Sequence, residues 1–338
     1  MKKTGETMTK IKTPAPILRT TSELSTRDHL DHLAARFRIR RSKHRVEPGL
    51  YQLGSPNPDS SVFVSANYTL SFDALRSALK GVDAWILVLN THGINVWCAA
   101  GKGTFGTDEL VSKIAETGLK DVVHHRTLIL PQLAGPGVAA HQVRKRSGFK
   151  VEYGPVRAAD LPDYLGSHEA SPEMRLVEFT LKDRAVLIPV ELVGILIPLV
   201  IAAIIVYVLY GLLPALATAT AILAGVALFP LLLPWLPFED FSVKGLILGL
   251  VVTLPFSLAM IVRDPQDWVV IATAILILIL LPPITSFISL NFTGATTFTS
   301  RSGVKSEIYA YVPIQAILFG SGLLLMIALR ILSFAGIS

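Results

Sequence analysis

The pattern of apolar and polar positions divides the chain into two halves of different character. In the first half, short apolar runs typical of buried strands alternate with amphipathic stretches typical of helices. The predicted strands are residues 61–66, 82–90, 122–130 and 149–153, and the predicted helices are residues 72–79, 107–118, 138–146 and 160–165. This alternation predicts a Rossmann-like α/β domain with a mostly parallel sheet, in which ligands bind beyond the carboxyl ends of the strands.

The second half contains five long apolar stretches. Each is close to the roughly 20 residues that a helix needs to cross a hydrocarbon core of about 30 Å. We therefore expect an all-α transmembrane domain of five helices at about residues 188–210, 212–235, 243–262, 268–290 and 312–329. The predicted organisation is a basic N-terminal extension (1–47), a cytoplasmic α/β domain (48–181) and the transmembrane domain (182–338).

Composition supports this division and excludes several protein classes. The chain is 51% hydrophobic and only 17% charged, which argues against a disordered protein. Its single cysteine, Cys98, excludes an intrachain disulfide. A basic cluster at residues 36–45 is either part of a solvated helix or tail, or a patch for anionic lipid or an acidic partner. Because no aromatic platform accompanies it, we do not expect a nucleic-acid partner.

Lysine and arginine near the ends of the predicted spans indicate their orientation. A cytoplasmic first half places five basic residues inside (Lys182, Arg184, Lys244, Arg301 and Lys305) and two outside (Arg263 and Arg330). This excess favours a multi-pass protein of the cytoplasmic membrane with its α/β domain in the cytoplasm. Apart from Glu191, near the inner end of the first span, no acid or base lies at the centre of a span, which argues against an ion-coupled transporter.

The segment 90–107 carries the candidate chemistry. Cys98 lies between a predicted strand end and a glycine-rich stretch, and three roles are open: a buried inert residue, a nucleophile, or a ligand to a soft metal. A P-loop is excluded, because Val96 stands where that motif needs glycine and Gly103 where it needs Ser or Thr. A zinc site is poorly supported, because His124 and His125, adjacent on a predicted strand, would face opposite sides.

Residues 95–102 (NVWCAAGK) resemble, at every position, the cap-helix motif of the HgcA family, the membrane-bound corrinoid proteins of microbial mercury methylation. Segments 48–68, 131–157 and 291–304 resemble the same family and its relative, the corrinoid iron–sulfur protein of the acetyl-CoA pathway. The resemblance covers about residues 48–310, and the five apolar stretches fit the membrane-bound family. The usual histidine-ligated corrinoid motif, Asp-x-His-x-x-Gly, does not occur in the sequence.

The resemblance implies that the α/β domain binds a corrinoid and that the Cys98 thiolate is the lower axial ligand of its cobalt. It further implies an enzyme, a methyltransferase that moves a methyl group from methyl-Co(III) corrinoid to inorganic Hg(II), giving methylmercury. A thiolate donates electron density, which favours a carbanion-like methyl group. The implied cofactor-binding residues are Asn95, Val96, Trp97, Cys98, Ala99, Ala100, Gly101, Lys102, Thr104 and Phe105. For these, ordinary capping, core packing or solvation stays an alternative.

The resemblance also implies partners. These are a ferredoxin with two 4Fe-4S clusters, HgcB, a methyl donor linked to methyl-tetrahydrofolate, Hg(II) and membrane lipid; a homo-oligomer is an open possibility. One cysteine cannot hold an iron–sulfur cluster, so the electrons must come from outside the chain. The segment 291–305 is either a solvated connector or a loop that covers the corrinoid domain or a partner. Two rival functions stay open: a corrinoid methyl carrier for another acceptor, as in the acetyl-CoA pathway, and a non-enzymatic membrane scaffold.

Overall fold

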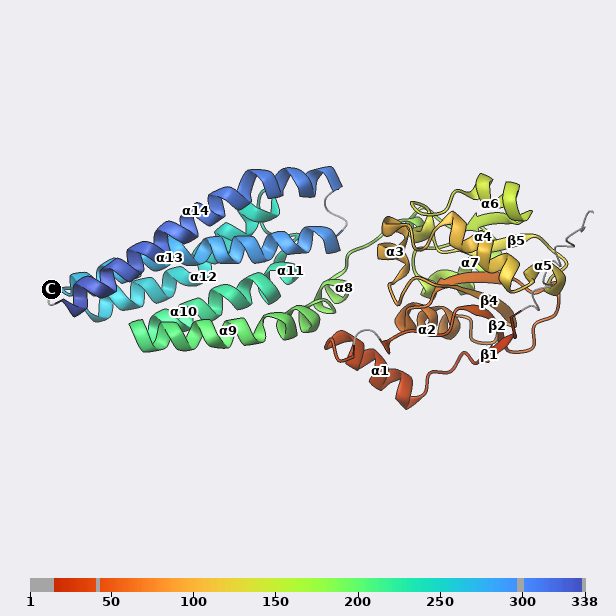
Figure 1. Ribbon diagram of the computed structural model, residues 1–338, viewed down its shortest axis with the longest axis horizontal. Coiled ribbons are helices and arrows are strands. Elements are labelled where there is room, and N and C mark those ends of the chain that lie inside the picture. Colours follow the sequence, from red (N-terminus) through yellow and green to blue (C-terminus); the bar gives the residue numbers. More distant parts are fainter. Residues whose placement is uncertain (1–14, 41–42, 297–300, 336–338) are drawn as a thin grey trace, which may run out of the picture. The chain divides into compact units, whose positions relative to one another are not determined.

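The computed structural model describes residues 15–40, 43–296 and 301–335. The chain folds as two compact units, Met1–Val177 and Glu178–Ser338. We call the first the α/β unit and the second the helical unit, and each is described by itself. Figure 1 labels their helices and strands.

A six-stranded sheet forms the centre of the α/β unit, in the order β1-β2-β4-β3-β5-β6. Among the described strands, β2 and β4 pair antiparallel and the other pairings are parallel. The predicted mostly parallel α/β sheet is therefore confirmed. The strands are β1 (Leu18–Thr20), β2 (Gly49–Leu53), β3 (Val62–Ala66), β4 (Ala84–Leu89), β5 (Thr127–Leu130) and β6 (Lys150–Tyr153).

Helices cover both faces of this sheet, because alternate strand residues point to opposite sides. On one face, Val64 and Leu87 pack with α3 (Val96–Lys102), α4 (Thr107–Glu116), α5 (Leu119–Val122) and α6 (Ala140–Ser147). On the other, Phe63 and Ile86 pack with α2 (Thr69–Ala78) and α7 (Leu161–Ser167). Figure 1 shows this layered arrangement around the strands. Strands buried on both faces explain the continuous apolar run at residues 84–89.

Several boundaries differ from the sequence-based expectations. The strand predicted over 122–130 begins at Thr127, because residues 119–122 form the helical turn α5 and the Arg126 guanidinium donates to the carbonyl of Val123 at 2.6 Å. His124 and His125 therefore lie in a turn and not on a strand, and their rings bond Asp59 and the Ser60 carbonyl. The helix predicted over 107–118 begins at Thr107 as expected, after the cap Gly106, but ends at Glu116.

The polar N-terminal segment contributes more structure than its sequence suggested. Strand β1 adds a parallel strand beside β2, and helix α1 (Thr26–Arg36) follows it. Ser25 caps α1, since its hydroxyl accepts the Asp28 amide while the Asp28 carboxylate accepts the Ser25 amide. The sheet thus extends to Leu18, well before the predicted domain start at residue 48.

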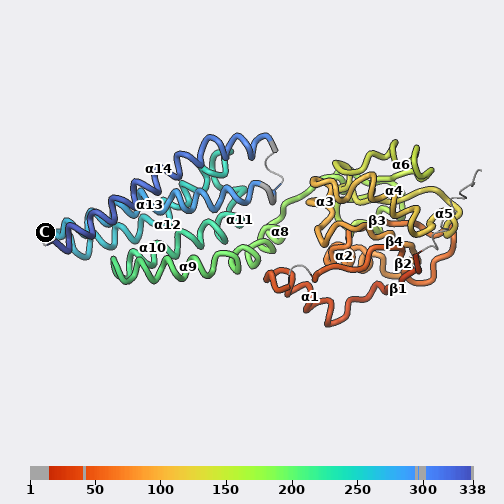
Figure 2. Tube along the Cα trace, in the orientation of Figure 1, coloured from red at the N-terminus to blue at the C-terminus, as the bar shows by residue number. Residues whose placement is uncertain are grey.

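The helical unit contains, among the described residues, five helical segments of sufficient length and apolarity to cross a bilayer, which confirms the expected five apolar helices. They are Leu181–Tyr210, Leu212–Leu232, Phe241–Arg263, Trp268–Thr293 and Ser302–Phe334. Their helices are α8 (Leu181–Ala185), α9 (Ile188–Tyr210), α10 (Leu212–Leu223), α11 (Phe229–Leu232), α12 (Phe241–Arg263), α13 (Trp268–Leu290) and α14 (Arg301–Phe334). The long helices of this unit run alongside one another (Figure 2). The second segment contains a π-helical stretch, Ala224–Leu228, immediately before α11, where Pro230 lacks the amide that a regular helix needs.

Glycines and buried polar groups hold these helices together. A Cβ on Gly249 of α12 would lie 2.7 Å from the Cα of Pro282 in α13, so only glycine permits this approach. The buried carboxylate of Glu307 accepts the amides of Phe241 and Ser242 at 3.2 and 3.1 Å, which caps the start of α12. The Ser286 hydroxyl donates to the Ser242 carbonyl at 2.6 Å and links α13 to α12.

Part of the predicted connector 291–305 is packed rather than solvated. Residues 291–295 form a 3₁₀ turn after α13, in which Phe292 and Thr293 are buried. The Phe292 ring lies 6.1 Å from the Phe229 ring, and the Thr293 hydroxyl donates to the Leu290 carbonyl. Residues 297–300 lie outside the described residues, so the expectation that this loop covers a corrinoid stays a prediction.

Candidate functional site

Helix α3 carries the cysteine motif and follows the carboxyl end of β4. The turn between them, residues 91–94, is built around Asn67, which directly follows β3. The buried Asn67 carboxamide oxygen accepts the amides of Thr91 and Gly93, each at 3.0 Å. The Thr91 hydroxyl donates to the Ile94 carbonyl at 2.6 Å. Two neighbouring parallel strands therefore fix the position at which α3 begins.

Asn95 caps α3 and orients its first turn. Its side-chain oxygen accepts the amide of Cys98 at 2.9 Å, so the backbone beneath the cysteine is hydrogen-bonded by the residue three positions earlier. Asn95 is exposed and Val96 is buried, so the helix enters the core with its first residue. Asn95 therefore acts as a helix cap, which was one of the two roles considered for it, and its role toward a cofactor stays a prediction.

The two faces of α3 differ sharply. Val96, Ala99 and Ala100 are buried against the core, whereas Trp97, Cys98, Gly101 and Lys102 are exposed. Cys98 is a free cysteine, and the exposed fraction of Trp97 is 40%. The inert buried role considered for Cys98 is thereby excluded, because its thiol lies on the open face.

A close backbone contact anchors the buried face. A Cβ on Gly137 would lie 2.2 Å from the Phe105 carbonyl oxygen and 2.9 Å from the Ala100 Cα, so the loop before α6 touches α3 directly. The Tyr153 hydroxyl donates to the Val138 carbonyl at 2.6 Å and holds this loop to β6. Burial raises the pKa of Tyr153, so this donor keeps its proton through the physiological range.

Thr104 and Phe105 follow the left-handed cap Gly103. The Phe105 side chain is fully buried in the core, and its amide donates to the Ala99 carbonyl at 3.1 Å. The half-buried Thr104 hydroxyl lies 3.4 Å from the same carbonyl oxygen. The structure therefore places these two residues where they close the end of α3, and their role toward a cofactor stays a prediction.

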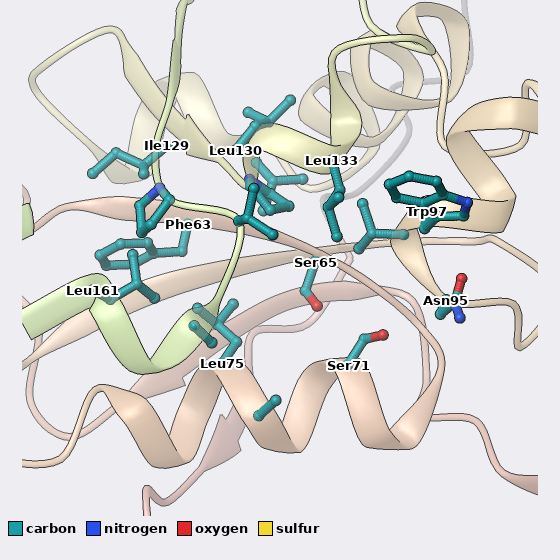
Figure 3. A pocket seen from close by; sticks show the side chains of 17 residues that line it. Phe63, Ser65, Ser71, Leu75, Asn95, Trp97, Ile129, Leu130, Leu133 and Leu161 are labelled. Atoms are coloured by element: carbon teal, nitrogen blue, oxygen red, sulfur yellow. The ribbon is translucent and has the colours of Figure 1, made fainter. Parts of the chain in front are cut away.

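A cavity of about 240 Å³ lies beside the start of α3, at the carboxyl ends of β3 and β5. Figure 3 shows Asn95 and Trp97 at one end of it, with the hydroxyls of Ser65 and Ser71 directed toward its interior. Most of its lining is apolar. It comes from the sheet, from α2, from the start of α3 and from the segments after β5 and β6: Phe63, Val64, Ala74, Leu75, Val96, Ile129, Leu130, Pro131, Leu133, Pro155, Val156, Ala158 and Leu161.

The cavity occupies the place where parallel α/β sheets bind ligands. Ser65 lines the edge of the cavity, and only 3% of its surface is exposed. Its hydroxyl has no hydrogen-bond partner among the described residues. Sequence reasoning did not identify Ser65, Ser71, Asn67 or Gly137 as functional. Their positions in the sequence could have indicated them. Ser65 lies near the end of the predicted strand 61–66, Asn67 directly follows it, and Gly137 lies in a Gly-Pro-Gly loop.

Residues 17–165 match one family model. Its description is CO dehydrogenase/acetyl-CoA synthase delta subunit, and the match covers most of the α/β unit. Fewer than half of the 338 residues of the chain are included, and none of the helical unit is.

Curated relatives agree with this match. The gamma subunits of the acetyl-CoA decarbonylase/synthase complexes of Methanopyrus kandleri and Archaeoglobus fulgidus are 33% and 34% identical over 127 residues. The corresponding subunit of Methanothermobacter thermautotrophicus is 32% identical over the same length. Each match covers 37% of this chain and 27% of the relative, so the chain spans about a quarter of the length of these relatives.

Proposed function

We propose that the chain is a membrane-anchored corrinoid protein that transfers methyl groups, with the Cys98 sulfur as the lower ligand of cobalt. The single observation that carries the proposal is the exposed thiol on the open face of α3, beside a cavity at the carboxyl edge of the sheet. The matched relatives are subunits of acetyl-CoA decarbonylase/synthase complexes, which supports a methyl-transfer role.

The residues present fit a corrinoid. The open face of α3 offers Cys98 together with Gly101, which has no side chain to hold a flat macrocycle away from the helix. Thiolate is a ligand that soft and borderline metal centres accept. The apolar cavity with its two serine hydroxyls suits the base at the end of a corrinoid nucleotide tail. A bound corrinoid would supply a cobalt centre that accepts a methyl group and passes it on.

Each residue of the motif then has a defined task. The Asn95 cap and the buried Val96, Ala99 and Ala100 keep α3 rigid, so the thiol is held at one position. Trp97 lines the cavity at the start of α3, and Lys102 places a positive charge on the open face that carries Cys98. Gly137 and Phe105 support this arrangement from the core side.

We propose inorganic Hg(II) as the methyl acceptor. The support is the complete NVWCAAGK resemblance and the joining of the α/β unit to five apolar helices. A thiolate ligand raises electron density at the metal, which favours delivery of a methyl group to an electrophile. The proposal includes an external electron donor of the ferredoxin type (HgcB), a methyl-tetrahydrofolate-linked donor, a lipid bilayer and a cytoplasmic α/β unit.

The test compares the full-length protein with its Cys98→Ala variant, both loaded with a corrinoid. Each is supplied with a methyl donor, a reductant and Hg(II), and methylmercury is measured. We expect methylmercury from the wild type and none from Cys98→Ala, with corrinoid still bound to both. Trp85→Phe, a substitution in β4 away from the cavity, serves as a control and should retain activity.

A second acceptor separates the two methyl-transfer hypotheses. If the loaded wild type forms no methylmercury but methylates an acetyl-CoA synthase partner, the acceptor is the one used by the matched relatives and the mercury proposal is wrong. If the protein binds no corrinoid, both hypotheses fail and the scaffold interpretation takes their place.

A further inference from the structure

Helix α1 attaches to the α/β unit mainly through polar and charged side chains, and the one residue of α1 that is buried is the small Ala35. Three contacts join one of its faces to the unit: Asp28 to Arg76 at 3.0 Å, Asp31 to His44 at 2.8 Å and His32 to Asp73 at 2.7 Å. Positions 28, 31 and 32 are spaced three and four residues apart, so they lie on one side of the helix. This side is the inner face of α1.

Arg76 of α2 makes this attachment firm. Only 6% of its surface is exposed, and its guanidinium also donates to Asp73 at 2.6 Å and to the carbonyls of Thr21 and Glu23 at 2.8 Å. Figure 1 shows α1 on the outer side of α2. The inner face is therefore fixed, and the opposite face of α1 must point away from the unit.

That opposite face is apolar. Leu30 is 62% exposed, Leu33 53% and Phe37 41%, at the spacing i, i+3 and i+7 of one helical stripe. Ile39, in the turn that follows, is 56% exposed. A helix on the surface of a globular domain normally turns its leucines inward and its charges outward. Here the arrangement is reversed, which indicates that something else covers the leucines.

The residues around this stripe are basic. Arg27, Arg38 and Arg40 are exposed, whereas the acidic Asp28 and Asp31 are engaged on the inner face. The outward surface thus combines an apolar stripe with positive charge that pairs with no acidic side chain among residues 15–40 and 43–296. This combination is typical of helices that lie in the interface of an anionic bilayer.

We propose that α1 and the turn after it, residues 27–40, form a membrane-surface anchor for the α/β unit on anionic lipid. The chain brings the bilayer within reach, because the first apolar segment begins at Leu181 and the α/β unit ends at Val177. The three residues between them span at most about 10 Å when extended. A second attachment point on the same surface needs no new encounter in solution.

The test places an environment-sensitive fluorophore on the apolar stripe of the full-length protein. Leu33→Cys is labelled in a Cys98→Ala background, and the protein is placed in nanodiscs of phosphatidylcholine alone or of phosphatidylcholine with phosphatidylglycerol. We expect about a twofold rise in emission, with a blue shift, when the anionic lipid is present. A label at Leu30→Cys should respond in the same way, and a label at the exposed Lys120 of α5 should not.

Charge reversal provides the matched control. Arg38→Glu with Arg40→Glu should abolish the rise, whereas Arg144→Glu with Lys145→Glu on α6, an equal change of charge at exposed residues, should leave it intact. Equal emission in both kinds of nanodisc would overturn the proposal, because a protein surface that covers the stripe does not depend on the lipid headgroup. Loss of the rise in the α6 variant would also overturn it.

Discussion

Glycine permits a close backbone contact in each unit. In the α/β unit it lets the loop before α6 touch α3, and in the helical unit it lets α12 touch α13. The two contacts have opposite consequences. At Gly137 the close backbone approach holds a helix whose other face is open and carries the Cys98 thiol. At Gly249 the close approach brings α12 and α13 together, and polar groups between them, such as Ser242 and Ser286, are buried. The same device thus presents a reactive group in one unit and buries polar groups in the other.

Several buried polar groups of the helical unit bond to one another and to helix ends. Gln315 donates to the Ser286 hydroxyl at 2.7 Å, and Ser286 donates to the Ser242 carbonyl. Glu307 caps α12 from the neighbouring helix α14. These contacts explain how the helices pack. The exposed thiol of Cys98, by contrast, lies on α3 in the α/β unit.

The largest expected effect comes from closing the gap at Gly137. Gly137→Ala forces a side chain against backbone atoms of both Phe105 and Ala100, and we expect a loss of about 3 kcal/mol in unfolding free energy together with weaker corrinoid binding. Denaturant unfolding and a corrinoid titration measure the two effects. Gly166→Ala is the control, since a Cβ there meets nothing within 4 Å. Equal unfolding free energies and equal corrinoid binding of the two variants would contradict the close contact between Gly137 and α3.

The corresponding change in the helical unit separates the two regions. Gly249→Ala places a Cβ 2.7 Å from the Pro282 backbone, and we expect a loss of about 1–3 kcal/mol in helical-unit stability. Corrinoid binding by the α/β unit should stay unchanged. Thermal unfolding in detergent, with Gly320→Ala as the control, measures the first effect. A parallel loss of corrinoid binding would show that the two units are not independent.

Removal of the helix cap gives a smaller effect confined to α3. Asn95→Ala leaves the Cys98 amide without its side-chain acceptor, which costs about 1 kcal/mol at an N-cap. Hydrogen exchange of the first amides of α3 should become faster, while exchange in α4 should not change. Asn95→Ser, which retains a capping oxygen, should restore most of the protection. Equal exchange rates in Asn95→Ala and in the wild type would show that the Asn95 cap does not stabilise the first turn of α3.

The smallest effect is expected from acid. Burial opposes ionisation of Asp28, but hydrogen bonds from Ser25 and Arg76 outweigh it and hold the pKa of Asp28 below its ordinary value of 3.8. A carboxyl with a lowered pKa stabilises the fold above the ordinary value, and this contribution disappears as the pH falls through the lowered pKa. Below about pH 4 we therefore expect α1 to loosen. Hydrogen exchange of α1 at pH 5 and pH 3, compared with Asp28→Asn, measures this change.

The sequence predicted the parts of the fold that depend on local patterns. Uninterrupted apolar runs located β4 and the five long helices, and the resemblance of residues 95–102 to a cap-helix motif indicated the helix that Asn95 caps. It did not predict β1, α1 or the late start of β5. The segment before residue 48 is too polar to reveal a strand, and α1 is held by distant partners such as Arg76. The cavity beside α3 likewise combines residues from Phe63 to Leu161, which no local pattern connects.

The central claim is that the Cys98 sulfur ligates the cobalt of a bound corrinoid. Cobalt X-ray absorption on the corrinoid-loaded full-length protein and on Cys98→Ala tests it most directly. We expect a sulfur scatterer in the first coordination shell of the wild type that is lost in the variant. A first shell of nitrogen and oxygen alone in the wild type, or a sulfur scatterer that persists in Cys98→Ala, would contradict it.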